Sequence, residues 1–222
     1  MFEVCCATMG SVSAAAEAGA ERIELCKALE CDGLTPDIDT LTAARKIYNG
    51  KINVLIRCRD GNFVYTDGEV EQMCREIASV AAGGADGIVI GALTPEGDID
   101  TSAVRKMMDS APGLSVTFHR AFDKCADPFK ALEEIIGLGC DRILTSGTAA
   151  TAFEGEGLLR ELVERAAGRI KIMAGAGVNS SNAAEIHHAT GCDEMHGSAR
   201  RGKPDSDILE IKEIINSLNN IP

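Results

Sequence analysis

Eight apolar, strand-like segments alternate with helical patterns along this 222-residue chain, and this alternation limits the fold more than any other feature. The strand-like segments are 2–7, 22–26, 52–58, 86–92, 114–120, 141–146, 169–175 and 193–198. Each is followed by a stretch whose apolar residues recur with helical spacing. Parallel strands need a crossover connection, which is usually a helix, because a short hairpin joins only antiparallel strands. Strands that alternate with helices are therefore expected to run parallel to one another.

A short internal repeat marks every second strand of this series. The segments "AGAERIEL" (18–25), "GGADGIVI" (83–90), "LGCDRILT" (138–145) and "TGCDEMHG" (190–197) each join small residues and an acidic residue to an apolar run. This order is typical of a helix end, a tight turn and the next strand. The copies are spaced at about twice the ~25 to 30 residues of one strand and one helix.

The alternation therefore predicts an α/β protein with a closed (β/α)8 TIM barrel, and residues 1–222 are expected to form one domain. An open, doubly wound sheet is the alternative architecture. That fold usually carries a glycine fingerprint in its first strand-to-helix turn, and "CCATMGSVS" lacks it.

The charge of the chain limits its partners. A net charge of −12 opposes general binding to nucleic acid or to an anionic membrane, so any anion site must be local. No segment has the length of a membrane span, and the first residues do not resemble a cleavable signal, so a cytoplasmic location is expected. Nine cysteines without metal-finger spacing are expected to be mostly free thiols. The number of subunits stays open, a homo-oligomer included.

Two strands share a pattern in which a glutamate precedes a cysteine by two residues. Glu3 and Cys5 have this spacing in "FEVCC", as do Glu24 and Cys26 in "RIELC". Because residues two apart share one face of a strand, all four are expected inside the barrel, on strands about 4.8 Å apart. The two thiols should then lie close together, and Arg57 on the third strand is the expected counter-ion of Glu24.

The same alternation directs other polar side chains to the mouth of the barrel, where barrel enzymes place their chemistry. His119 in "VTFHR" and His196 and Ser198 in "EMHGS" are expected to point inward. Arg57 and Arg59 share one face of their segment. They are either part of a site or only the ion partners of the two buried glutamates.

A glycine-rich turn follows the seventh strand and suggests an anion site. Gly175 and Gly177 lie in "MAGAGVNSSN", which is expected to run directly into a helix, and free amides at a helix N-terminus attract anions. Ser146 in "TSG" and Ser198 and Arg200 in "HGSARR" are expected at the same mouth, together with His196. Arg59 is a further candidate for binding the anion.

The motifs "ERIELC", "IRCRDGNFVYTD", "VTFHRAFD", "CDRILTSG" and "HGSARR" resemble the CutC family, historically called copper homeostasis proteins. The resemblance extends from the first strand to about residue 201 and implies a TIM barrel. It also implies a cytoplasmic role in copper tolerance or trafficking, with Cys5 and Cys26 as ligands of Cu(I). This chain departs from the family pattern at Cys58, where the family usually has proline, and in "MAGAG", where it usually has "MPGGG".

Two classes of function follow from these residues. In the first, Cys5 and Cys26 bind a copper ion as Cu(I), which prefers soft thiolate ligands, although both could equally be small buried core residues. In the second, the chain is an enzyme that acts on a small anionic or phosphorylated metabolite, with Glu24, Arg57 and His119 as catalytic residues. No organic cofactor is expected in either case, and a non-catalytic interaction module is a more distant alternative.

Overall fold

A computed structural model describes residues 1–110 and 112–220 of the chain. Eight parallel strands form a closed barrel in the order β1 to β8, which confirms the predicted (β/α)8 TIM barrel. The strands are β1 (Phe2–Cys6), β2 (Arg22–Leu25), β3 (Lys51–Leu55), β4 (Gly87–Ile90), β5 (Ser115–Phe118), β6 (Arg142–Thr145), β7 (Lys171–Ala174) and β8 (Glu194–Gly197).

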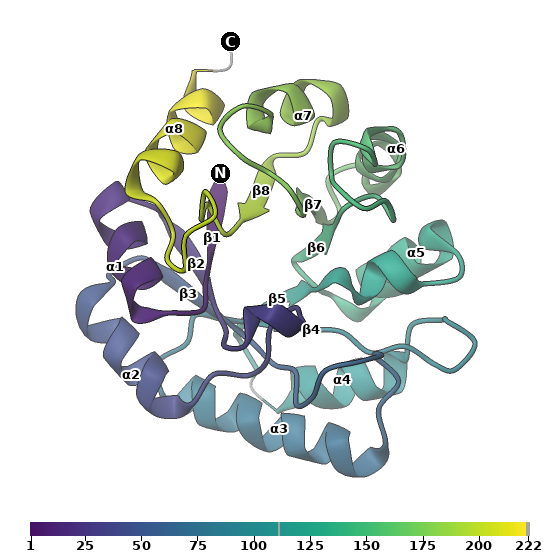
Figure 1. The fold of residues 1–222 in the computed structure, drawn as a ribbon. Helices are drawn as coiled ribbons and strands as arrows, with labels where there is room; N and C mark the ends of the chain where they lie inside the picture. Colours follow the sequence, from purple (N-terminus) through teal and green to yellow (C-terminus); the bar gives the residue numbers. More distant parts are fainter. Residues whose placement is uncertain (111, 221–222) are drawn as a thin grey trace.

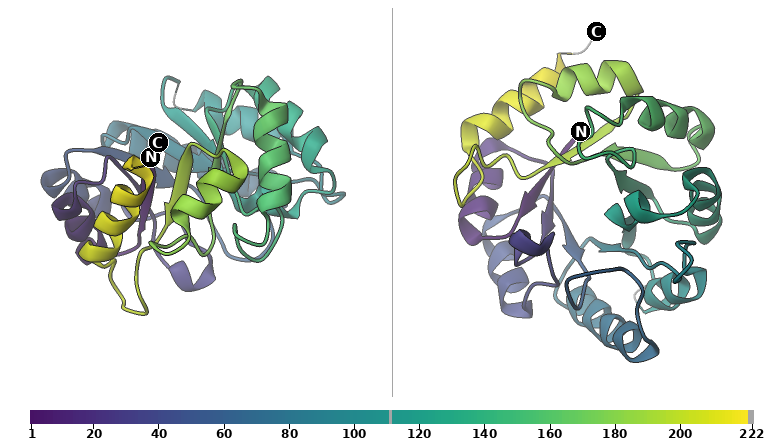
Figure 2. Two further views of the ribbon diagram at one scale, coloured as in Figure 1. Left: turned by 90° about the horizontal axis from the view of Figure 1, so that it is seen from above. Right: turned by 45° about the vertical axis from the view of Figure 1, so that its right-hand side comes forward.

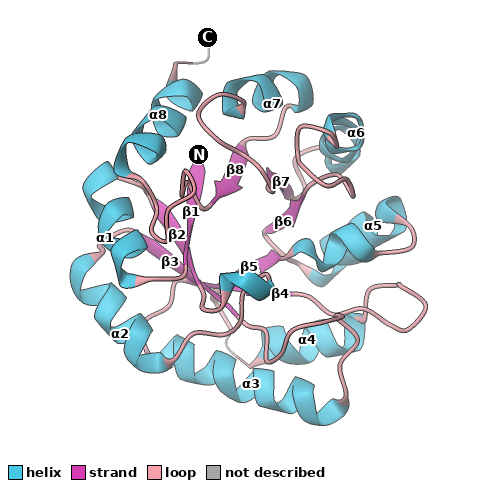
Figure 3. Ribbon diagram, viewed as in Figure 1, coloured by secondary structure: helices cyan, strands magenta, loops and turns pink. Residues whose placement is uncertain are grey.

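Eight α-helices surround the barrel, as Figure 1 shows along the barrel and Figure 2 from two further directions. They are α1 (Met9–Ala18), α2 (Ile38–Ile47), α3 (Asp67–Ala82), α4 (Thr101–Asp109), α5 (Pro128–Leu138), α6 (Glu156–Ala166), α7 (Ala183–Thr190) and α8 (Ile208–Asn219). Two short 3-10 helices, η1 (Leu29–Cys31) and η2 (Arg120–Lys124), follow β2 and β5. Figure 3 shows the strands inside the ring of helices.

Local sequence signals explain where the helices begin and end. Thr66 and Glu69 form a reciprocal capping box at the start of α3. Asp127 caps α5 and Pro128 occupies its first turn, where a missing N–H costs nothing. Gly139 ends the same helix in the left-handed conformation, which glycine adopts without strain. No helix among the described residues has the length and apolar character needed to cross a membrane.

The expected alternation of inward and outward side chains is confirmed. Val4, Leu25, Phe118 and Met195 belong to the large apolar core that packs between the barrel and the helices. Inside the barrel, a separate small apolar cluster contains Cys5, Cys26, Leu55 and Val89. The thiols therefore lie on the interior face.

A network of buried charged side chains fills the interior of the barrel beneath that cluster. Arg22 Nε donates to Glu3 Oε2 at 2.5 Å, and the Arg22 guanidinium also binds Glu194. Arg142 Nε donates to Glu194 Oε2 at 3.2 Å, and Asn53 Nδ2 donates to Glu3 Oε2 at 3.0 Å. Buried charges persist only when they are paired and hydrogen-bonded, and this network provides both. At the upper end of this network, Glu3 Oε1 also accepts a hydrogen bond from His196 of β8 at 3.0 Å.

Candidate functional site

A cavity of about 500 Å³ opens at the carboxyl ends of the strands. Its lining combines side chains from the strand ends with residues of the loops that follow β2, β3, β5, β7 and β8. Barrel enzymes bind their ligands at this end. The polar and charged side chains that line the cavity are Cys5, Glu24, Cys26, Asp32, Arg57, His119, Arg120, Asp123, Lys124, His196 and Ser198.

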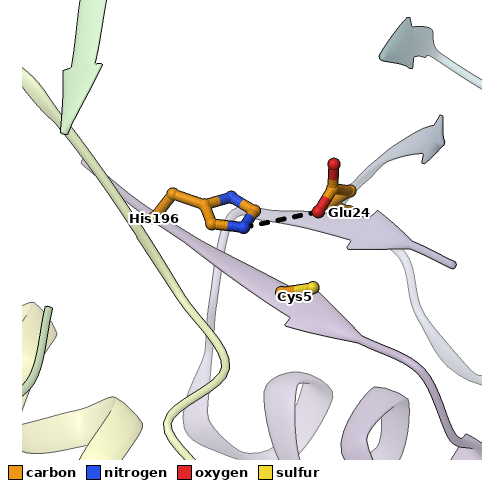
Figure 4. A group of neighbouring side chains, drawn as sticks. All are labelled: Cys5, Glu24 and His196. Carbon is orange, nitrogen blue, oxygen red and sulfur yellow. Dashed lines mark ion pairs between the residues drawn. The ribbon is translucent and has the colours of Figure 1, made fainter. Parts of the chain in front are cut away.

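The floor of the cavity joins two thiols to a histidine and a carboxylate. The Cys5 and Cys26 sulfurs are 3.8 Å apart, as expected for neighbouring strands, and all nine cysteines are free thiols. His196 Nδ1 donates to Glu3 Oε1 at 3.0 Å, and its Nε2 lies 3.3 Å from Glu24 Oε2. Figure 4 shows the imidazole facing Glu24, with Cys5 beside this pair. Potential ligand atoms of Cys5, Glu24 and His196 lie within 4.8 Å of one another.

Burial and charge set the protonation of these groups. Burial lowers the pKa of His196, but the carboxylates of Glu24 and Glu3 outweigh this effect and raise it above its usual value. Burial raises the pKa of Glu24. The hydrogen bond with Cys26, burial and the charge of Glu24 raise the pKa of the Cys5 thiol well above its usual range. The floor therefore favours a positively charged occupant, such as a metal ion or a proton.

The expected ion pair between Arg57 and Glu24 is wrong. Strand β3 ends at Leu55, so Arg57 lies in the following loop and not beside Glu24 on the sheet. Its guanidinium donates to three backbone carbonyls, those of Cys31, Gly33 and Gly61. The partner of Glu24 is His196, because the closed barrel brings β8 beside β1.

His119 lies in the wall of the cavity, but its hydrogen bonding and its lowered pKa do not suit a general base. Its Nδ1 accepts a hydrogen bond from the amide of Ala121 at 3.1 Å, so a neutral imidazole carries its proton on Nε2. Burial and the nearby charge of Arg57 lower the pKa of His119 to about 3. At neutral pH this side chain is a hydrogen-bond donor and not a base.

The expected anion-binding residues divide into two groups. Gly177, His196 and Ser198 line the cavity, whereas Arg59, Ser146, Gly175 and Arg200 are not part of its lining. Arg59 turns away from the cavity and pairs with Glu69 at 2.5 Å. Ser146 is buried and its hydroxyl donates to the carbonyl of Ala149 at 2.6 Å.

Gly175 leaves no free space for a ligand, since a Cβ there would lie 2.5 Å from Leu144 Cδ1. The turn after β7 also differs from the expected phosphate loop. Helix α7 begins at Ala183 and not directly after Gly177. The amide of Ser180 donates to the carboxylate of Glu210 at 2.7 Å, and the amide of Asn179 to the side chain of Asn182 at 2.8 Å. Side chains of the protein itself therefore satisfy these amides.

Comparison with known proteins gives the family. The profile of the CutC family matches residues 1–201. The chain belongs to the CutC family. A CutC family protein from Bacteroides fragilis is 49% identical over 201 residues, which cover 90% of this chain and 80% of the relative. A CutC family protein from Pasteurella multocida is 47% identical over 199 residues, which cover 90% of this chain and 82% of the relative.

Solved structures agree with the barrel. A CutC protein from Streptococcus agalactiae, provisionally described as a copper homeostasis protein, has a TM-score of 0.85 and 33% identity. The match covers 89% of this chain and 98% of that one. A thiamine phosphate pyrophosphorylase from Pyrococcus furiosus has a TM-score of 0.66 and 20% identity, over 98% of this chain and 94% of that one. This second likeness supports the fold alone.

Sequence reasoning missed several residues of this CutC barrel. Arg22 and Arg142 each stand at the start of a strand, and Arg22 precedes Glu24 by two residues, so the alternation already indicated an inward side chain. Phe63 lines the cavity from the loop after β3 and Lys124 from the short helix η2, where neither strand nor α-helical periodicity applies.

Proposed function

We propose that this CutC protein binds one Cu(I) ion through the thiolates of Cys5 and Cys26 and thereby takes part in copper homeostasis. The observation that carries the proposal is the 3.8 Å separation of two reduced sulfurs at the floor of an open cavity. Soft thiolates prefer Cu(I), and His196 offers a nitrogen ligand beside Cys5. The description of the Streptococcus agalactiae relative supports the same role.

The charge of the site agrees with a cation. Burial and the Glu24 carboxylate disfavour the thiolate form of Cys5 in the absence of a positive ion. An ion that binds both sulfurs replaces their protons and removes this cost. Copper in this role is cargo that enters through the mouth of the barrel.

Titration of the reduced protein with Cu(I) against a chromophoric chelator tests the proposal. The wild type should bind one equivalent, and a Cys5→Ser, Cys26→Ser double variant should lose this binding. Cys140→Ser, Cys192→Ser is the matched control, because both thiols are buried at the opposite end of the barrel, before β6 and β8. Equal affinity in the two double variants would contradict the site.

A second candidate function is an enzyme that acts on a small metabolite. The cavity of about 500 Å³ is far larger than one metal ion, and polar side chains surround it, which favours an organic ligand. A thermal-shift screen of the metal-free protein with sugar phosphates and carboxylates should then show stabilisation. Failure of every compound to stabilise the protein would count against this function.

A further inference from the structure

Arg57 places a positive charge in the cavity wall without a carboxylate to neutralise it. The residue is only 3% exposed. Nη1 donates to the carbonyls of Cys31 and Gly33 at 2.6 and 3.0 Å, and Nη2 donates to that of Gly61 at 2.9 Å. Among the described residues no carboxylate lies within ion-pair distance of Arg57, and its Nε–H has no partner. Carbonyls satisfy hydrogen bonds, but they leave the net charge uncompensated.

The neighbours of Arg57 do not supply the missing charge. Burial raises the pKa of Tyr65 to about 12, so this phenol stays neutral at physiological pH. Phe63 packs its ring 5.1 Å from Arg57 Cζ and contributes only a cation–π contact. Asp32 borders the same cavity but is exposed to solvent and forms no ion pair with Arg57.

His119 adds a second unpartnered donor to the same wall. It is 5% exposed, and its Nε2 has no hydrogen-bond partner. Because Nδ1 accepts from Ala121, the proton of the neutral ring is on Nε2. The Phe63 ring lies 5.0 Å from the His119 ring and so contacts both donor residues. A buried donor without a partner is costly, and a ligand oxygen removes that cost.

We propose that this wall binds the carboxylate group of a small organic acid, with Arg57 supplying the charge and His119 Nε2–H a hydrogen bond. Lys124 of η2 adds a positive charge to the cavity lining, beside Arg120, which pairs with Asp123 at 2.8 Å. A carboxylate fits better than a phosphate. Two of the three guanidinium nitrogens of Arg57 are already committed to carbonyls, and two of the amides after β7, those of Asn179 and Ser180, are occupied by side chains of the protein.

His119 lies on the side of the cavity away from the copper site, whereas Arg57 follows β3, the neighbour of the strand β2 that precedes Cys26. His119 follows β5 and Cys5 lies on β1, and four steps around an eight-stranded barrel place them on opposite sides. The remaining part of the ligand therefore extends across the cavity toward Glu24 and the thiols. The proposal rests on the small-molecule function of the cavity and is independent of copper binding.

Calorimetric titration of the reduced, metal-free protein tests the proposal with acetate, pyruvate and malate. Pyruvamide, the neutral counterpart of pyruvate, and inorganic phosphate are titrated beside them. We expect at least one carboxylate to bind, and pyruvamide to bind at least tenfold more weakly than pyruvate if pyruvate is that ligand. Binding by phosphate alone would overturn the carboxylate inference and leave the small-molecule function standing, whereas no binding by any anion would contradict both.

Two substitutions of His119 separate ligand binding from structural support. His119→Asn retains an acceptor for the Ala121 amide but removes the donor that faces the ligand. His119→Gln restores a donor near the position of Nε2. The Asn variant should weaken carboxylate binding at least tenfold and the Gln variant should recover part of it, with unchanged melting temperatures. The Cys140→Ser, Cys192→Ser protein, whose thiols lie outside the cavity lining, should bind the carboxylate as the wild type does. Unchanged affinity in the Asn variant would refute the role of His119.

Discussion

Glu3 offers a quantitative test of the buried charge network. Its side chain is fully buried and binds Arg22, Asn53 and His196. Burial raises the pKa of this carboxyl, but the hydrogen bond from His196 and the charges of Arg22, His196 and Arg142 outweigh burial and lower it to about 2. We predict that Glu3→Gln, which keeps the shape but removes the charge, destabilises the protein in a pH-dependent manner.

The magnitude follows from the difference between the usual pKa of 4.5 and the folded value of about 2. At 1.36 kcal/mol per pKa unit this is about 3 kcal/mol in the free energy of unfolding. Because folding lowers the pKa of Glu3, the stabilisation is fully present above pH 4.5 and is lost as the pH falls toward 2. Less than half of this stabilisation, about 1 kcal/mol, should remain at pH 3.

Urea unfolding of both proteins at pH 7, 5, 4 and 3 measures this difference. Glu133→Gln is the control, because Glu133 forms an exposed pair with Arg169, and such pairs contribute little. The reasoning would be refuted if Glu3→Gln cost less than about 1 kcal/mol at pH 7, or if the cost were the same at pH 5 and pH 3.

Two further predictions concern packing and copper. Gly155→Ala places a Cβ against the carbonyl oxygen of Ser146, whereas the Cβ of Gly157→Ala meets open space. Thermal unfolding should therefore show that the first variant alone loses about 3 kcal/mol in the free energy of unfolding. Because the thiol pKa of Cys5 is raised, Cu(I) binding by Cys5 and Cys26 should release protons and weaken as the pH falls, and titrations in buffers of different ionisation enthalpy will show whether it does.

The alternation of strand-like and helical segments was sufficient to predict the barrel, and the alternation of side chains along each strand was sufficient to predict its inward and outward faces. Val4 and Leu25 pack outward and Cys5 and Glu24 face inward because side chains alternate along a strand, whatever lies around them. The closeness of the two thiols followed from the same rule, once β1 and β2 were taken as neighbours.

The partners of the charged groups could not be predicted in this way. The pair of Glu24 and His196 depends on how the last strand closes against the first, and that closure joins residues 172 positions apart. Arg57 was misplaced because β3 is shorter than its apolar run suggests. The occupied amide of Ser180 after β7 depends on Glu210, which comes from α8 and has no local relation to the turn.

One carboxylate holds both ends of the barrel interior together. Glu3 binds Arg22 below and His196 above, and Arg22 in turn binds Glu194. A substitution that replaced any one of these residues with an apolar one would leave the charge of its neighbour buried and unpaired. The charged residues of the interior can therefore change only by several substitutions at once. We therefore expect these residues to be exchanged as a group during evolution, and the geometry of the mouth to change with them.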